Sequence, residues 1–361
     1  MSSYVVALDV GGTAMKGGLV SASGEVLLTD RRPTPRVDGP LRVIAAIRTF
    51  IDDLAQAGHG TPSGVGLAVP GLVTEDRAVY SANIGWKDVL ATDFTSLSVP
   101  VRLGHDVRTG GLAERVLGAG RSEPDFLFLP IGTGIAGAMI IEGRPYGGSS
   151  GWGGEIGHIS VFPDGERCAC GQIGCLETYA SAASVGRRYG ERLSRAASVQ
   201  RPDTAYSAPG PSAAAYSNPA SAPGAYPAPP SAPAAHSASA PPASAEDVVA
   251  LAMRGDPDAS AVWDEALEAL SIALASYTLL LDPSSIVIGG GLAEAGAALF
   301  DPLAERLEGR LTFRSAPPLR HAALGMNAGM LGAALLGWQA AGIADAGASW
   351  ALDVLRSPSV P

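Results

Sequence analysis

The sequence predicts an α/β fold, because short apolar segments of strand character alternate with longer segments of helical periodicity. Three of the apolar segments run directly into a glycine-rich turn. The composition is that of a globular chain, since 47% of the 361 residues are hydrophobic and 17% are charged. At roughly 150 residues per domain, this length predicts two or three domains.

The first half of the chain carries most of the alternation. We expect a buried strand at 4–10, a hairpin at 17–31 around Ser23-Gly24, and an amphipathic helix at 40–57. A buried strand at 65–71, a strand at 99–107, a helix over roughly 109–117 and a hairpin-like pair of strands within 126–143 follow.

The second half ends in apolar segments. A long helix is expected over 261–281 and a strand at 284–291 that ends in glycines. Residues 322–344 carry no charge, but five glycines, Asn327 and Gln339 make them a poor membrane span. We therefore expect a tightly packed interior helix there and no membrane partner.

Residues 201–245 differ in composition from the rest of the chain. Most are Ala, Ser or Pro, and none is a large aliphatic residue. Such a segment buries too little apolar surface to offset the entropy of ordering it. It is therefore expected to be a disordered insertion between two helices.

All three cysteines fall within eight positions, ten residues after a histidine. Three thiolates and an imidazole complete a tetrahedral structural zinc site, and the glycines at 171 and 174 let the loop wrap around one ion. The alternative is three small buried cysteines without a ligand. The expected metal ligands are His158, Cys168, Cys170 and Cys175.

The net charge of the chain restricts the classes of partner that it can be expected to bind. A net charge of −10 argues against binding to nucleic acid or an anionic membrane. The first residues lack a basic stretch before the apolar run and reach Asp9 at once, which is unlike a signal peptide. Three thiols beside a histidine fit a reducing compartment, so a cytoplasmic location is expected.

Each glycine turn can bring backbone N–H groups against phosphate oxygens, while a hydroxyl or a lysine adds a donor and charge. None is a Walker A sequence, and the third has Glu294 where GxGxxG would end in glycine. Three such turns predict a nucleotide clamped between two lobes. The expected contacts are Asp9, Gly11, Gly12, Thr13 and Lys16 in the first turn, Gly132, Thr133 and Gly134 in the second, and Gly289 and Gly290 in the third.

Six motifs follow one another along the chain: DVGGTAMK, GHDVRTGGLAE, GTGIAGA, EIGH, CACGQIGCLET and IVIGGG. Their order resembles that of the ROK family of sugar kinases and sugar-responsive repressors. The resemblance implies the two-lobed actin-like, ribonuclease-H-like ATPase fold. It implies a small lobe at 1–118, completed by a helix at 326–343, and a larger lobe at 119–325 with the zinc loop 155–177 and the insertion 201–245.

The resemblance also implies residue roles. Asp106 matches the catalytic base that takes a proton from the sugar hydroxyl. Asp9 matches a residue beside Mg²⁺, Thr13 and Thr133 match phosphate contacts, and Gly289 and Gly290 match part of the adenosine pocket. The sugar contacts implied are Asn83, Glu155, His158 and Glu177, with His158 binding zinc through one ring nitrogen and sugar through the other.

Two residues depart from the family pattern around the base, which usually reads Asn-Asp-Ala-Asn. His105 replaces the first Asn and is expected to alter a sugar contact. Arg108 replaces the second and is expected either to pair with Asp106 or to point toward the phosphates. A purely structural alternative makes Asp106 the N-cap of the 109–117 helix.

The leading hypothesis is an ATP- and Mg²⁺-dependent hexose kinase, most simply a glucokinase acting on the 6-hydroxyl, with structural Zn²⁺. A kinase for fructose or an N-acetylated amino sugar is an alternative, as is a catalytically weak sugar-binding protein. The repressor alternative is disfavoured because only eight residues precede Asp9, too few for a winged-helix head. A homodimer or homotetramer is expected from the resemblance.

Overall fold

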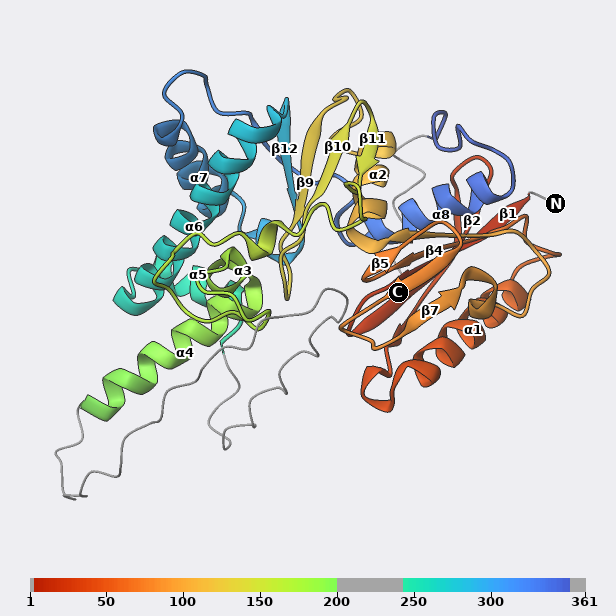
Figure 1. Ribbon diagram of the computed structural model, residues 1–361, viewed down its shortest axis with the longest axis horizontal. Helices are drawn as coiled ribbons and strands as arrows, with labels where there is room; N and C mark the ends of the chain where they lie inside the picture. The colour runs from red at the N-terminus through yellow and green to blue at the C-terminus, as the bar shows by residue number, and fades with distance from the viewer. Residues whose placement is uncertain (1–2, 200–242, 351–361) are drawn as a thin grey trace, which may run out of the picture.

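The computed structural model describes residues 3–199 and 243–350 and contains two five-stranded sheets and one three-stranded sheet. Figure 1 shows the two larger sheets side by side, with helix α2 (Asp106–Leu117) between them and helix α8 (Ala328–Ala340) across the first. The chain completes the first sheet before it enters the second, and returns to the first through α8.

The first sheet has the strand order β3-β2-β1-β4-β8. β1, β4 and β8 pair in parallel, and the β2–β3 hairpin extends the sheet from β1 by antiparallel pairing, so only β2 runs against the other strands. The parallel strands β1 and β4 are almost completely buried, which explains why both read as continuous apolar runs in the sequence. The strands are β1 (Tyr4–Val10), β2 (Ala14–Ser21), β3 (Val26–Pro33), β4 (Val65–Val69) and β8 (Val101–His105).

The second sheet repeats this arrangement in the order β11-β10-β9-β12-β13. β9, β12 and β13 pair in parallel, and β10 and β11 continue the sheet from β9 by antiparallel pairing. β9 therefore occupies the place that β1 has in the first sheet. The repeated topology brings two glycine turns to matching strand ends. The strands are β9 (Phe126–Pro130), β10 (Ala138–Ile141), β11 (Arg144–Tyr146), β12 (Ser285–Gly289) and β13 (Leu319–His321).

Two of the remaining helices begin with recognisable start signals. Helix α6 (Pro257–Leu281) starts with a proline in its first turn, and Asp256 accepts the backbone N–H of Ala259 at 2.8 Å as its cap. Ser244 and Asp247 form a capping box on α5 (Ala245–Met253). The other helices are α1 (Pro40–Ala57), α3 (Leu176–Ala180), α4 (Ala182–Val199) and α7 (Ala297–Arg310).

A small antiparallel sheet of β5 (Leu72–Val73), β6 (Arg77–Tyr80) and β7 (Lys87–Leu90) lies between β4 and β8 in the chain. The sequence analysis did not predict it, because its strands are only two to four residues long and mostly exposed or half-buried.

Helix α8 packs against β1, β4, β8 and α2, and almost all of its residues are buried. Glycines allow this close approach: a Cβ at Gly66 would lie 1.8 Å from the carbonyl oxygen of Ala333, and one at Gly332 would lie 2.1 Å from that of Thr109. The prediction of a packed interior helix at the end of the chain is therefore confirmed. In the described part of the chain, no helix is both long and apolar enough to cross a membrane.

Helix α2 packs against strands of both sheets and ends at a buried carboxylate. Glu114 accepts backbone N–H groups from Ala119 at 2.7 Å and Leu324 at 2.9 Å, so one side chain joins the end of α2 to the segment that precedes α8. Unpaired, a buried carboxylate would be strongly destabilising, which makes these contacts part of what holds the segment in place.

Most of the expected elements agree with the structure to within a few residues. The strand at 4–10 and the helix at 40–57 have the predicted limits, whereas α2 begins three residues earlier than expected. The insertion predicted at 201–245 lies outside the described residues except for its last three, which lead into α5.

The contact between β4 and α8 gives a stability prediction. Gly66→Ala is expected to lower the free energy of unfolding by about 3 kcal/mol, because the new methyl group would strike the backbone of α8. Urea unfolding measures the change. Gly190→Ala is the matched control: Gly190 lies within α4 with open space around it, so this variant should gain about 0.5–1 kcal/mol. Equal effects of the two substitutions would contradict the packing argument.

Candidate active site

The three glycine turns meet at one cavity of about 520 Å³. Gly11, Gly132 and Gly289–291 line it together with three carboxylates, those of Asp9, Asp106 and Glu294. Residues 325–329, from the start of α8 and the turn before it, contribute Gly325, Met326, Ala328 and Gly329 to the opposite wall. The structure thus brings together turns that are more than 100 residues apart in the sequence.

The first turn is closed by backbone and side-chain hydrogen bonds. The N–H of Gly11 donates to the carbonyl of Ala14 at 3.0 Å, and the hydroxyl of Thr34 donates to the carbonyl of Gly11 at 2.7 Å. Thr13 is exposed at the tip. Lys16 Nζ donates to the carbonyl of Met326 at 3.1 Å, so the lysine also ties this turn to the segment before α8.

The second and third turns pack directly on each other. The N–H of Ile131 donates to the carbonyl of Gly289 at 2.8 Å. Gly290 has φ +76°, and a Cβ there would lie 2.4 Å from the carbonyl oxygen of Ile131. No residue other than glycine fits this contact without strain. Thr133, in the second turn, is exposed.

Asp9 lies at the end of β1 and faces both the cavity and α8. A Cβ at Gly329 would lie 2.4 Å from Asp9 Oδ2, so the carboxylate occupies the space that a larger residue on α8 would fill. The pKa of Asp9 is raised to about 7, mainly by burial and to a smaller extent by the nearby Asp106 carboxylate, while Lys16 opposes the shift. A carboxylate in this state is stabilised by any cation that binds beside it.

Asp106 is the first residue of α2, and its carboxylate lines the cavity. The residue in the N-cap position is His105, whose Nδ1 lies 3.4 Å from the backbone N of Arg108, so the alternative that Asp106 is the N-cap is wrong. Burial lowers the pKa of His105, which leaves its ring neutral near pH 7. The 3.2 Å contact between His105 Nδ1 and Asp106 Oδ1 is therefore not an ion pair.

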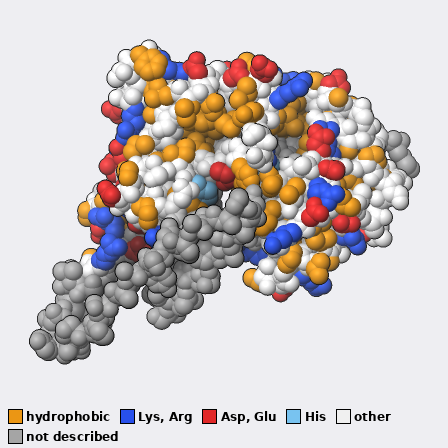
Figure 2. Space-filling view, in the orientation of Figure 1, with side chains coloured by type: hydrophobic (Ala, Val, Ile, Leu, Met, Phe, Trp, Pro, Cys, Tyr) orange, Lys and Arg blue, Asp and Glu red, His pale blue; other side chains and the backbone are white. Residues whose placement is uncertain are grey.

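A second group of polar side chains adjoins Asp106. Burial raises the pKa of Glu155; His158 and Arg108 oppose this shift, while Asp106 and Glu177 add to it, so all of these side chains act on the same carboxylate. Glu177 Oε2 accepts the backbone N–H of Ile135 at 2.7 Å, next to the second glycine turn. Figure 2 shows acidic and histidine side chains close together near the middle of this face.

Asn83 is placed differently from the other predicted sugar contacts. It is exposed in the turn between β6 and β7. Its neighbours Ile84 and Trp86 are buried and fix the turn, with the Trp86 ring packed edge-on against Phe94 at 5.5 Å. Among the described residues, no hydrogen bond joins Asn83 to the cavity.

The three cysteines and His158 gather at one point. Cys170 Sγ and Cys175 Sγ are 3.7 Å apart, Cys168 Sγ and His158 Nδ1 are 3.8 Å apart, and all four ligand atoms lie within 4.8 Å of one another. Ligands bound to one tetrahedral zinc ion stand roughly 3.5–3.8 Å apart, given bond lengths of about 2.0–2.3 Å. The donor set therefore fits such an ion.

The loop that carries these ligands is anchored from outside. Glu166 forms ion pairs with Arg187 and Arg188 of α4, and Arg188 also pairs with Glu265 of α6. The backbone N–H of Glu166 donates to the hydroxyl of Tyr179 at 2.6 Å. The metal-ligand loop and α3, which carries Glu177, are thus held by the same neighbours.

Several residues at the cavity were not predicted from the sequence. Thr34 reaches the first turn from beyond β3, while Glu294 and His321 line the cavity near the third turn. A packed interior helix was expected over 322–344, but nothing in the sequence identified Asp9 as the group packed against Gly329.

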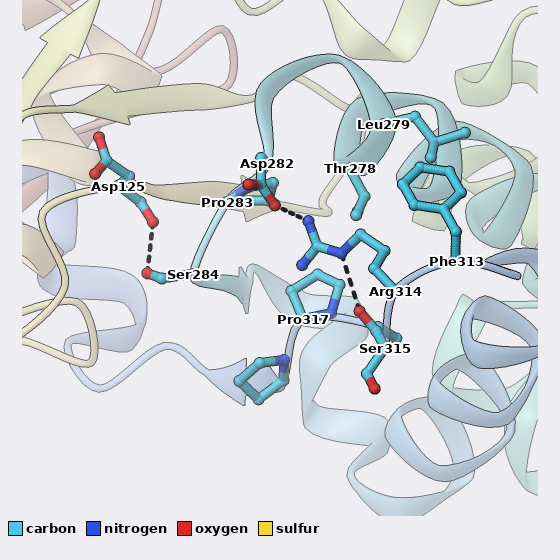
Figure 3. Close-up of a pocket in the computed structure, with 12 residues that line it drawn as sticks. Asp125, Thr278, Leu279, Asp282, Pro283, Ser284, Phe313, Arg314, Ser315 and Pro317 are labelled. Atoms are coloured by element: carbon cyan, nitrogen blue, oxygen red, sulfur yellow. Dashed lines mark hydrogen bonds and ion pairs between the residues drawn. The ribbon is translucent and has the colours of Figure 1, made fainter.

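A second cavity, of about 780 Å³, lies at the end of α6 (Figure 3). Asp282 and Arg314 form an ion pair across it, with Leu279 and Phe313 on one side and Pro317 near the other. None of the site residues predicted from the sequence lines this cavity. The predicted motifs therefore place no chemistry in this second cavity.

Two α/β sheets of matching topology, with glycine turns and paired carboxylates between them, define the class of actin-like, ribonuclease-H-like ATPase folds. The ROK family model matches residues 5–340, and the chain belongs to that family.

Three relatives illustrate the similarity. A glucokinase of Halalkalibacterium halodurans is 31% identical over 345 residues, covering 93% of this chain and 94% of the relative. A ROK hexokinase of Thermus thermophilus is 30% identical with a TM-score of 0.69, covering 93% of this chain and 98% of the other. A ROK glucokinase of Streptomyces griseus, solved with glucose and AMPPNP, is 26% identical with a TM-score of 0.71, covering 93% and 100%.

The raised pKa of Asp9 predicts a pH-dependent cost in stability. Because its folded pKa of about 7 exceeds its ordinary value of 3.8, burial of the charged form lowers stability progressively as pH rises toward 7. Asp9→Asn should therefore stabilise the protein more at pH 8 than at pH 5, by about 2–3 kcal/mol. Urea unfolding at both pH values, without Mg²⁺ or nucleotide, measures this difference. The same gain at both pH values would refute a raised pKa.

Proposed function

We propose that the chain is an ATP-dependent hexose kinase that transfers the γ-phosphate to the 6-hydroxyl of glucose. The observation that carries the proposal is the position of Asp106, which lies between the cavity formed by the three glycine turns and the group of Glu155, His158 and Glu177. A nucleotide and a polyhydroxyl substrate bound in these two regions would meet at its carboxylate. The similarity to glucokinases supports glucose as the substrate.

In this mechanism the glycine turns bind the phosphates, and Asp106 removes the proton from the attacking hydroxyl. Backbone N–H groups that are not used within the turns supply donors, since those of Gly11 and Gly132 already donate to the carbonyls of Ala14 and Gly134. The hydroxyls of Thr13 and Thr133 are exposed at the tips of the turns. Phosphoryl transfer depends mainly on positioning and on stabilisation of charge, with a smaller contribution from the base. Lys16 adds positive charge to the cavity wall.

The residues present also fit the metal ions that such a kinase uses. Asp9 and Asp106 are close enough to raise the pKa of Asp9, an arrangement that favours a bound cation. Mg²⁺ there would neutralise charge on the transferred phosphate. We assign zinc to His158, Cys168, Cys170 and Cys175; with His158 Nδ1 turned to the sulfurs, its Nε2 on the opposite ring edge can bind a sugar hydroxyl.

We further propose two lobes, residues 1–118 with the helix near 326–343 and residues 119–325, that assemble as a homodimer or homotetramer. The packing of α8 on the first sheet supports this division of the chain. Sedimentation velocity measures the oligomeric state.

A coupled assay of ADP release over a panel of sugars tests the function. Turnover should be highest with glucose and should depend on Mg²⁺. Preference for fructose or for an N-acetylated amino sugar would redefine the substrate within the same reaction. Sugar binding without ADP release would instead favour a catalytically weak sugar-binding protein. This alternative arises because His105 and Arg108 replace the two asparagines usual around the base.

Loss of the base gives the first kinetic prediction. Asp106→Asn keeps the shape of the side chain but removes the proton acceptor, so kcat should fall by about 10²–10⁴ while the KM for sugar changes little. Asp88→Asn is the control, since Asp88 is exposed on β7 and its φ of +55° suits asparagine equally well. Near-normal turnover of the Asp106 variant would exclude it as the base.

Metal content gives the second prediction. Purified protein should contain one zinc ion per chain, and Cys175→Ser should reduce that content, because the buried thiolate is one of four ligands. Elemental analysis measures the stoichiometry. Metal-free protein with full activity would contradict the assignment.

A further inference from the structure

Arg108 extends from the first turn of α2 to the loop of residues 147–154 that follows β11. Its Nη1 donates to the carbonyl oxygens of Gly151 at 3.1 Å and Gly153 at 3.2 Å. A Cβ at Gly147 would lie 3.7 Å from the guanidinium, so the base of the loop also packs against this side chain. The guanidinium therefore binds the loop and does not point toward the phosphate-binding turns. The expectation that Arg108 points toward the phosphates is wrong.

The loop consists largely of glycine. Its sequence, GGSSGWGG, contains five glycines, and Gly148, Gly151 and Gly154 all have positive φ. One backbone hydrogen bond, from Gly153 N–H to the carbonyl of Gly147 at 2.8 Å, closes it. Glycine-rich backbone loses much conformational freedom when it is ordered, so contacts from outside must fix this segment.

A second contact comes from the small antiparallel sheet. A Cβ at Gly151 would lie 2.6 Å from Leu72 Cδ1, so the loop backbone rests directly on the side chain of β5. Leu72 and Arg108 both precede the second sheet in the chain, whereas the loop follows β11. The loop thus spans the junction between the two halves and is fixed at Gly151 by a polar and an apolar contact.

The loop leads directly into the proposed sugar site. Gly154, its last residue, accepts the backbone N–H of Gly137 at 2.7 Å, and Glu155 and His158 follow. The guanidinium lies among acidic groups: the carboxylates of Asp106 and Glu155 both favour its charged form against the effect of burial. A cation near both carboxylates lowers the cost of bringing them to one site.

We propose that Arg108 is a positioning residue that fixes the 147–154 loop and so sets where Glu155 and His158 meet the sugar. It acts on binding of the sugar and takes no part in phosphoryl transfer. The inference rests on the proposed hexose kinase function for its kinetic consequence, while the contact with the loop stands on the geometry alone.

The test replaces the guanidinium and follows both the loop and the kinetics. Arg108→Met keeps the unbranched stem but removes every donor. Amide hydrogen exchange in residues 147–154, measured without sugar, should accelerate at least about tenfold. The KM for glucose should rise about tenfold or more, while kcat stays within about threefold and the KM for ATP does not change.

Arg115→Met is the matched control. Arg115 lies on the same helix and also donates to a backbone carbonyl, that of Arg121 at 2.8 Å, but it does not contact the loop. This variant should leave loop exchange and the KM for glucose as in the wild type. Leu72→Ala provides an independent change, since removal of the apolar contact should accelerate exchange in the same amides with Arg108 intact.

The outcomes separate this inference from the proposed function. If the wild type phosphorylates no sugar, the proposed hexose kinase function is refuted. The proposal that Arg108 fixes the loop is tested separately, and unchanged amide exchange in residues 147–154 of Arg108→Met would overturn it. A loss of kcat greater than about 100-fold at constant KM would place Arg108 in the chemical step and overturn its positioning role. Faster exchange with an unchanged KM for glucose would show that the loop does not set sugar binding.

Discussion

The structure depends on the direct approach of helix α8 to the backbone of the first sheet. At Gly66 a strand lies against the carbonyl of Ala333 with no side chain between them, and at Gly329 the helix leaves room for the carboxylate of Asp9. If α8 moved outward by the width of a methyl group, the wall formed by residues 325–329 would move with it. Lys16, which is hydrogen-bonded to Met326, would lose its partner. The packing of one helix therefore sets the shape of the cavity.

Negative charge is the second constraint. Asp9, Asp106, Glu155 and Glu177 converge on a small volume, and burial makes the charged forms of Asp9 and Glu155 costly. Two cations of the chain moderate this concentration of charge, Lys16 beside Asp9 and Arg108 beside Asp106 and Glu155. Bound cations stabilise a site of this kind, and its carboxylate oxygens can accept hydrogen bonds from a polyhydroxyl ligand.

Local sequence signals predicted much of this arrangement. Hydrophobic periodicity placed β1 and α1 at their observed limits, because both bury a continuous apolar surface. The clustering of the cysteines near His158 predicted a ligand group that the structure brings within bonding range of one ion. The orientation of the Arg108 side chain could not be predicted, because a long side chain can turn toward any hydrogen-bond acceptor that the tertiary structure places near it. The exposed position of Asn83 likewise depends on the small sheet, whose strands are too short to give a periodic signal.

Helix α2 packs on both sheets and begins at Asp106. An element that touches both halves of the molecule can serve as the pivot when one half rotates against the other, and α2 meets that condition. A group at the end of a pivot moves through a much smaller arc than groups on the rotating bodies. The glycine turns and the 147–154 loop would therefore travel toward a nearly stationary carboxylate, and in the proposed function this motion would bring the reacting hydroxyl to Asp106.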